Sequence, residues 1–349
     1  MTFRGFLMWV HLVLGLTGAV IVAIVAVTGA YITFQQPLTR WLNPIPVVAV
    51  PSASLDAEAI AQGVQEQFAP RRVASISIGE GNLATVVRLQ DRTTVFVDPA
   101  NSTIIGSRPA RFASLENLTA VMRRLHTNLV LGPRGKFIVT LATAEALLLV
   151  LTGTWLWWRK KHWQFRAWRG SAFRISWDLH NASGIWFLIP VLSMVVTGLL
   201  ISIPSPIYRV AGVAPAPWLN PPSSANSDSQ DPVSLARALA VADSVLAGGV
   251  RGVTIPFAPA GSFAVRKANE TVFVDQFTGA VIEVRPDRQL TAGDDAYQAI
   301  EHLHTGELFG VAGRAIMTLG TLMLALMTIT GLVLGWKRLL ILVGKLAKD

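Results

Sequence analysis

Four of the six histidines form two matched pairs, and paired imidazoles can ligate one metal ion from opposite sides. His11 superposes on His180 at a shift of 169 residues, and His126 superposes on His304 at a shift of 178 residues, both without gaps. The same two shifts align further residues: Gly15 with Gly184, Thr28-Gly29 with Thr197-Gly198, Gly132 with Gly310, and Thr152-Gly153 with Thr330-Gly331. The histidines therefore belong to an internal duplication.

A histidine inside an apolar helix is costly unless it has a partner, and imidazole is the usual axial ligand of six-coordinate b haem. We therefore predict two non-covalent, bis-histidine b haems, one ligated by His11 and His180 and the other by His126 and His304. The chain has no cysteine, which excludes covalent haem attachment, iron–sulfur ligation and disulfides. The alternative is that each histidine only forms a hydrogen bond across a helix interface.

Small residues accompany these histidines at helical spacing. Gly15 and Gly184 follow their histidines by four residues on the same helical face, where a side chain would collide with a porphyrin plane. A Thr-Gly pair occurs near the far end of each apolar helix, at the same depth in the membrane as the histidines on the other two helices. We therefore predict that the glycines of these pairs also bind the cofactor: Gly29, Gly153, Gly198 and Gly331. Close helix packing at small residues is the alternative explanation.

Other polar residues are weaker candidates. His302 has no histidine counterpart, because Arg124 stands there, and it is a second-best ligand or a neighbour of a haem propionate. Four cations could pair with propionates or simply mark membrane edges: Arg4, Lys136, Arg174 and Arg314.

The elements that must position these residues are apolar helices. The chain has 349 residues, 52% of them hydrophobic and 15% charged, with a mean hydropathy of +0.47, which is typical of a protein in a lipid bilayer. Four stretches reach the roughly 20 residues needed to cross it: 6–34, 137–158, 177–203 and 315–336. The net charge of +9 lies mostly beside membrane ends, so it does not indicate a nucleic-acid partner.

The duplication predicts a membrane α-helical fold with four transmembrane helices, arranged as two helix–module–helix repeats about a pseudo-twofold. The predicted segments are transmembrane helices over 1–34, 123–158, 177–203 and 300–338, outside modules over 35–122 and 204–299, a basic loop over 159–176 and a tail over 339–349. Each outside module reads as a small α+β unit, with helices over 55–68 and 233–246 and strands such as 73–78, 84–89 and 93–98.

Orientation follows from the basic residues of the short loops. Lysines and arginines crowd between the second and third stretches and follow the fourth, which predicts cytoplasmic termini and two large periplasmic segments of an inner-membrane protein. The first stretch also resembles a signal peptide, but His11 recurs as His180, so we expect it to be a working helix.

The assembled motifs resemble the PepSY-associated transmembrane family, and in particular its inner-membrane siderophore-iron reductases. The resemblance covers nearly the whole chain and includes Val274-Asp275, Thr278-Gly279 and Val281, which match the pattern V-D-x-x-T-G-x-V. In the first module Asn101-Ser102 replaces Thr-Gly, so that turn departs from the pattern.

The resemblance implies an oxidoreductase whose two b haems carry electrons outward to reduce Fe(III) in a periplasmic siderophore and release Fe(II). The donor it implies is a membrane quinol or a cytoplasmic reductant. Three alternatives stay open from the residues alone: a quinol-linked reductase of another periplasmic acceptor, a haem-free scaffold whose PepSY modules bind a partner, and a transporter.

Overall fold

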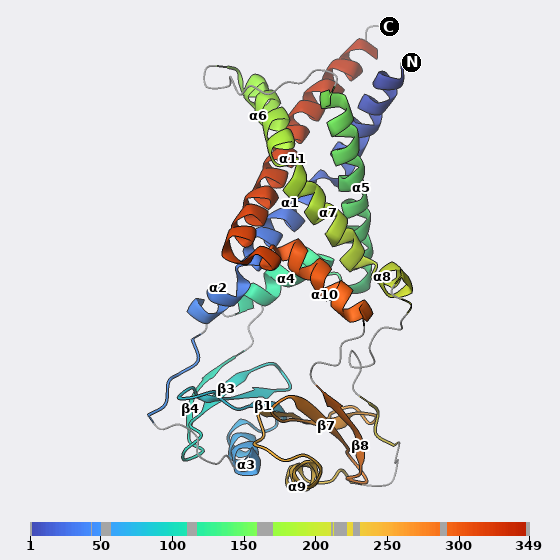
Figure 1. Ribbon diagram of the computed structural model, residues 1–349. Helices are drawn as coiled ribbons and strands as arrows, with labels where there is room; N and C mark the ends of the chain where they lie inside the picture. The colour runs from blue at the N-terminus through green and yellow to red at the C-terminus, as the bar shows by residue number, and fades with distance from the viewer. Residues whose placement is uncertain are drawn as a thin grey trace. The chain divides into compact units, whose positions relative to one another are not determined.

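The computed structural model (Figure 1) describes residues 2–42, 44–49, 57–109, 117–158, 170–210, 212, 222–225, 231–286 and 292–346. They form two compact units: a helical unit from 1–38, 118–214 and 292–349, and a sheet unit from 39–117 and 215–291. Most of the predicted basic loop, residues 159–169, lies outside the described residues.

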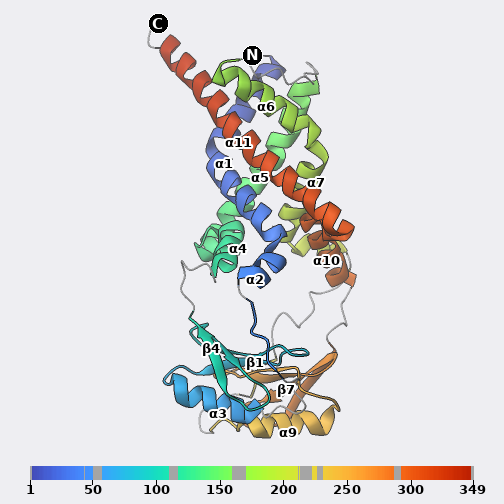
Figure 2. The same cartoon turned by 90° about the vertical axis from the view of Figure 1, so that its left-hand side faces the viewer.

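Long apolar helices build the helical unit. They are α1 (Phe3–Thr33), α5 (Gly132–Trp158) and α11 (Gly310–Leu346), and α1 and α11 lie side by side (Figures 1 and 2). These three are long and apolar enough to cross a membrane, and a fourth span exists if the bent pair α6 (Ala172–Trp186) and α7 (Leu188–Ser202) counts as one. The chain is therefore a multi-pass membrane protein with three to four spans.

The third span departs from the single straight helix expected over 177–203. It begins at Ala172 and bends by 73° between α6 and α7, at Phe187. Pro190 causes the break, because it has no amide hydrogen for the carbonyl of Trp186 and its ring crowds that carbonyl. The first repeat has Ile21 at this position, and α1 runs unbroken for 31 residues.

His126 and His304 also differ from expectation, because neither lies on the span that follows it. Two short helices, α4 (Leu118–Asn128) and α10 (Ala292–Thr305), carry them, so 123–158 and 300–338 are not continuous helices. The chain turns before α5 at Leu129, Val130 and Gly132, and before α11 at Gly306 and Gly310, all with positive φ. A left-handed backbone cannot continue a right-handed helix, which is why each span starts anew.

Two further short helices and one helical turn complete the helical unit and its edge. They are α2 (Gln35–Leu42), which follows α1, α8 (Ser205–Val210), which follows α7, and the 3₁₀ turn η4 (Glu307–Phe309) before α11. Trp41 of α2 is 78% exposed, as an aromatic anchor at a membrane–water interface would be.

The sheet unit holds eight antiparallel strands in the order β4-β3-β2-β1-β5-β6-β7-β8. The first repeat contributes β1 (Val73–Ser77), β2 (Thr85–Leu89), β3 (Thr94–Val97) and β4 (Ile104–Arg108), and the second contributes β5 (Gly252–Thr254), β6 (Ser262–Arg266), β7 (Glu270–Asp275) and β8 (Val281–Pro286). The strands expected near 73–78, 84–89 and 93–98 are confirmed to within one residue at each end.

The sequence predicts two separate modules, but the structure joins them: β1 pairs with β5, so both halves form one sheet. Each half alone would leave a strand edge with unpaired backbone groups, and the pairing removes both edges. Helices α3 (Ala57–Phe68) and α9 (Leu235–Val245) cover the same face of this sheet (Figure 1). Their buried residues, including Ile60, Val64 and Ala238, pack on strand residues in a single hydrophobic core.

The turn between β7 and β8 depends on the carboxylate of Asp275, which is only 4% exposed. It accepts backbone hydrogen bonds from Ala225 (2.6 Å), Phe277 (2.9 Å) and Thr278 (2.8 Å). Burial by itself raises the pKa of Asp275, but the hydrogen bonds from these three amides outweigh it and lower the pKa in the folded protein.

We expect Asp275→Asn to destabilise the sheet unit by about 1–3 kcal/mol, because an amide NH₂ then faces a buried backbone donor. Hydrogen-exchange protection of the Ala225, Phe277 and Thr278 amides measures the loss. The matched control is Asp98→Asn in the first repeat, where the side chain accepts a hydrogen bond from the amide of Ala100 at a more exposed turn.

The same contribution depends on pH. It is complete above the unfolded-state pKa of about 4 and is lost as pH falls through the lower folded-state pKa. Equal protection loss in the two variants would contradict this role of Asp275.

Candidate functional site

The structure brings the predicted histidines together in two pairs within the helical unit. His11 of α1 and His180 of α6 have ring centroids 6.3 Å apart, with their planes at 85°. His126 of α4 and His304 of α10 have centroids 6.2 Å apart, with planes at 54°. Since a metal–imidazole bond is about 2.0 Å and the nitrogen lies about 1.1 Å from the ring centre, two rings on opposite sides of one metal lie about 6.2 Å apart. Both pairs have the spacing of two axial ligands.

Each imidazole is held at its Nδ1 atom. Carbonyl oxygens accept from two of them, Met327 from His180 (2.9 Å) and Val25 from His126 (2.8 Å), so these Nδ1 atoms carry the proton. Threonine hydroxyls contact the other two, Thr152 at His11 (2.9 Å) and Thr197 at His304 (2.9 Å).

The threonine contacts assign the same tautomer. Thr152 donates its own hydrogen to Leu148 O, and Thr197 donates to Ser193 O, so each hydroxyl oxygen accepts from the histidine. In all four histidines the proton is therefore on Nδ1, and the Nε2 lone pair is left for a metal.

The glycines of the Thr-Gly pairs lie against these rings. A Cβ at Gly29, Gly153, Gly198 or Gly331 would come 2.9, 3.1, 3.1 or 3.2 Å from the Cε1 atom of His126, His11, His304 or His180. In the structure, each Thr-Gly pair makes a seat for the imidazole of a neighbouring helix: the threonine or a nearby carbonyl forms the hydrogen bond, and the glycine leaves room for the ring. That these glycines also bind the cofactor stays a prediction.

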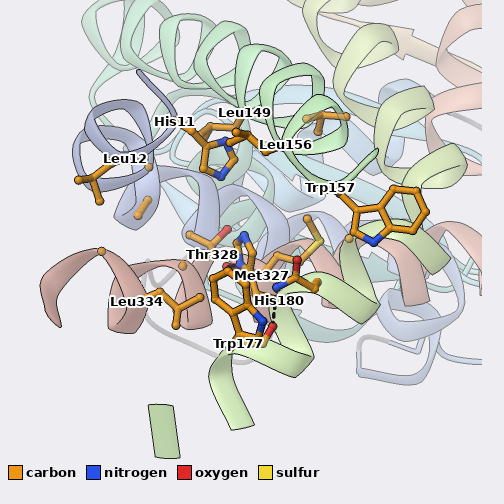
Figure 3. Close-up of a pocket in the computed structure, with 18 of the residues that line it drawn as sticks. His11, Leu12, Leu149, Leu156, Trp157, Trp177, His180, Met327, Thr328 and Leu334 are labelled. Atoms are coloured by element: carbon orange, nitrogen blue, oxygen red, sulfur yellow. Dashed lines mark hydrogen bonds between the residues drawn. The ribbon is translucent and has the colours of Figure 1, made fainter. Parts of the chain in front are cut away.

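Gly15 and Gly184 have a different environment, because they line a cavity beside the His11–His180 pair. This cavity has a volume of about 770 Å³, and its walls include both glycines and both of these histidines. Figure 3 shows His11 and His180 projecting into it among Leu149, Leu156 and Met327. Its size is that of a site for a sizeable organic ligand, about 300–1,000 Å³.

Cations gather along one end of this cavity. They are Arg4, Arg174, Lys337 and Arg338, and the sequence analysis had selected only the first two. Lys337 lies 4.1 Å from the ring centroid of Phe173, and Arg338 contacts the sulfur of Met8. Among the described residues, the buried Nε of Arg4 has no hydrogen-bond partner, so it remains available to an anionic group.

Asp178 is a residue of this region that the sequence analysis missed. Its side chain is fully buried on α6, two residues before His180, and Arg174 lies 3.3 Å from its carboxylate. An acidic residue inside a span is rare enough to have been a signal. Because Arg174 already shares its charge with Asp178, Arg4, Lys337 and Arg338 are the freer cations of the cavity.

Charged residues also lie close in the chain to His304, the α10 member of the His126–His304 pair. Arg314 donates to Glu307 (2.9 Å), while its buried Nε has no partner within the described part of the chain. His302 lies 3.8 Å from Glu307, and its side chain is 49% exposed, so its position favours an interaction with Glu307 over ligation. Lys136 is exposed.

The donor set indicates what kind of metal group fits. The described residues contain no cluster of three or more His, Cys, Asp or Glu that could hold a metal ion. Two imidazoles alone give a bare ion too few ligands, whereas a haem brings four nitrogens of its own and needs only axial ligands. The paired lone pairs, the cavity with its glycines and the free Arg4 Nε therefore fit a haem.

Comparison with known proteins addresses the family. No curated protein matches the chain significantly. A family model described as the PepSY-associated TM region matches residues 8–338, nearly the whole chain. With this match, the chain belongs to the PepSY-associated transmembrane family, as its motifs predicted.

Proposed function

We propose that this protein is an inner-membrane cytochrome that holds two b haems and moves electrons outward to reduce Fe(III) in a periplasmic siderophore. The observation that supports it most is the pair of bis-histidine sites, each with a centroid separation of about 6.2–6.3 Å and free Nε2 lone pairs. The donor is a membrane quinol or a cytoplasmic reductant. The siderophore as acceptor rests on the family resemblance.

The chain's own residues have defined tasks in this proposal. His11 and His180 would hold the inner haem, and His126 and His304 the outer one. Gly15 and Gly184 would leave room for the inner porphyrin, and Arg4, Lys337 and Arg338 would pair with its propionates. A haem bound in this way supplies reversible one-electron chemistry, and the apolar cavity walls exclude water from it.

The separation of the two sites supports passage across the bilayer. Along α1, seventeen residues separate His11 from Thr28, which contacts His126, and at 1.5 Å per residue this is about 25 Å. The hydrocarbon core is about 30 Å thick. The cations beside the inner pair agree with a cytoplasmic location for that end.

Iron release follows from the chemistry of the acceptor. One electron converts each Fe(III) to Fe(II), and hard oxygen-donor chelators bind the smaller trivalent ion more tightly. The reduced ion therefore dissociates more readily.

The first test is a reduced-minus-oxidised visible spectrum of the purified protein with haem quantitation. About two low-spin b haems per chain support the proposal, while colourless protein from haem-replete cells would favour a haem-free scaffold.

Single alanine variants should each remove one haem. His11→Ala or His180→Ala is expected to lose the inner haem and keep the outer one, and His126→Ala or His304→Ala is expected to do the reverse. Pyridine haemochrome assay should then give about one haem per chain, because the affected site loses one of its two axial bonds and holds its haem too weakly to retain it through purification. The matched control is His302→Ala, which should retain both haems. Loss of both from every variant would argue against separate sites.

Filling the cavity tests the inner site without touching its ligands. We expect Gly15→Leu to fold, because the nearest atom to a Cβ there is Leu149 Cδ2 at 3.8 Å and the cavity opens beyond it. The new side chain should exclude the inner haem and leave the outer haem as an internal control. Haem content and thermal unfolding of the same sample measure both effects, and two haems in this variant would place the porphyrin elsewhere.

The hydrogen bond between His11 Nδ1 and the Thr152 hydroxyl should strengthen His11 as a haem ligand. Thr152→Val removes the acceptor for the His11 Nδ1 proton and is expected to weaken inner-haem retention by about 10- to 100-fold. Competition with an apo-haem acceptor protein measures retention. Thr140→Val on the same helix is the control, since the Thr140 hydroxyl bonds only its own helix, at Lys136 O. Equal retention in both variants would show that the seat has no such role.

A further inference from the structure

The helical unit contains a carboxyl group that the proposed function does not use. Glu145 lies at the middle of α5, thirteen residues from either end, and it is the only acidic residue in α1, α5, α7 and α11. Ionisable side chains at such depth are costly and usually mark proton or ion pathways.

The structure makes room for this side chain. The carboxyl of Glu145 lies against the backbone of buried Gly18 on α1, where even a methyl group would overlap its Oε2 atom. A glycine at this one point therefore lets the carboxyl sit between two spans instead of pointing into lipid.

The duplication shows that this arrangement is specific to the first repeat. At the shifts that align the histidines, Phe187 takes the place of Gly18 and Met323 takes the place of Glu145. Both substitutes are apolar and large. The acid and its space therefore occur together in one half and are absent together in the other, although the surrounding histidine seats occur in both.

Glu145 has no hydrogen bond or ion pair with any described residue. His304 on α10 also lies beside α5, because its Cε1 atom and the Cγ2 atom of Thr143 are both within 4 Å of the same point at Gly198. The other titratable or charged residues on α5 and on the described helices that pack against it are Arg4, His11 and Tyr31 on α1, Arg123, Arg124 and His126 on α4, Arg134 and Lys136 on α5, and Arg174, Asp178 and His180 on α6, with none on α7. The nearest along α1 is His11, seven residues before Gly18, or about 10 Å along the helix axis. An ionisable side chain at this depth, with no partner among the described residues, is a candidate for a functional site.

We propose that Glu145 is an intramembrane proton-binding site that takes up a proton when the protein is reduced. This proposal rests on the proposed function. An electron arriving at the His11–His180 pair adds negative charge about 10 Å along the α1 axis from Gly18, against which the carboxyl lies, in a medium that screens poorly. Uptake of a proton by Glu145 would offset that charge.

Electrons and protons balance in this scheme. A quinol donor releases one proton with each electron that it gives up, and Glu145 takes up a single proton, with the electron held at the His11–His180 site, while any other proton goes to water. When the electron leaves to the external Fe(III) acceptor, the carboxyl returns its proton to water and becomes charged again. No other reactant is needed.

The test is a reduced-minus-oxidised infrared difference spectrum of the full-length haem-loaded protein, combined with redox titration at several pH values. The wild type should show the C=O band of a protonated carboxyl group on reduction, and its inner-haem midpoint potential should fall as pH rises. Glu145→Gln should lose the band and most of the pH dependence, with unchanged haem content. The matched control, Met323→Gln, puts the same amide at the equivalent point of the other repeat and should behave as wild type.

A second variant guards against misfolding. Gly18→Ala keeps the acid but displaces its carboxyl, so the band should shift in frequency while remaining present. A band that persists in Glu145→Gln, or a wild-type potential that does not vary with pH, overturns the proton site and leaves the cytochrome proposal intact. Protein that binds no haem overturns both.

Discussion

An imidazole placed between apolar helices must have both ring nitrogens satisfied, and the helical unit is arranged around that constraint. Nδ1 donates to a threonine oxygen or to a helix carbonyl, and the Thr-Gly pair that makes each seat stands on a different helix from the histidine it holds. Each histidine thereby fixes the register of two helices. The Nε2 lone pair is left free, and the second histidine of each pair lies with its ring centroid 6.3 Å (His11–His180) or 6.2 Å (His126–His304) away.

Because the chain is duplicated, the same Thr-Gly seat occurs four times, twice at each of the two histidine pairs. The two repeats differ at two points in the helical unit. Pro190 bends the third span, and Gly320 of α11 leaves room for it, whereas α1 passes the equivalent point unbroken. Gly18 and Glu145 are the second departure, and they give the first repeat a polar contact in mid-span that the second repeat lacks.

The sheet unit obeys a different rule. A four-stranded sheet by itself has two edges with unpaired backbone groups. The pairing of β1 with β5 joins the two repeats into one continuous sheet, with one hydrophobic core between the sheet and helices α3 and α9. The buried Asp275 carboxylate organises the turn after β7 through three backbone amides. Its counterpart, Asp98, stands at an Asn101-Ser102 turn with fewer contacts, which agrees with the weaker match of the first module to the family pattern.

The sequence by itself determined the four apolar stretches, the duplication and the family, and it predicted that His11 meets His180 and that His126 meets His304, because hydropathy, matched spacing and motif order are properties of the chain. It could not determine where helices break: positive φ values at Leu129 and Val130 and the effect of Pro190 depend on local geometry and packing. Nor could it show that the Thr-Gly pairs hold imidazoles, that β1 meets β5, or that Glu145 rests on Gly18. Those contacts join residues far apart in the chain, and only the tertiary structure decides which surfaces meet.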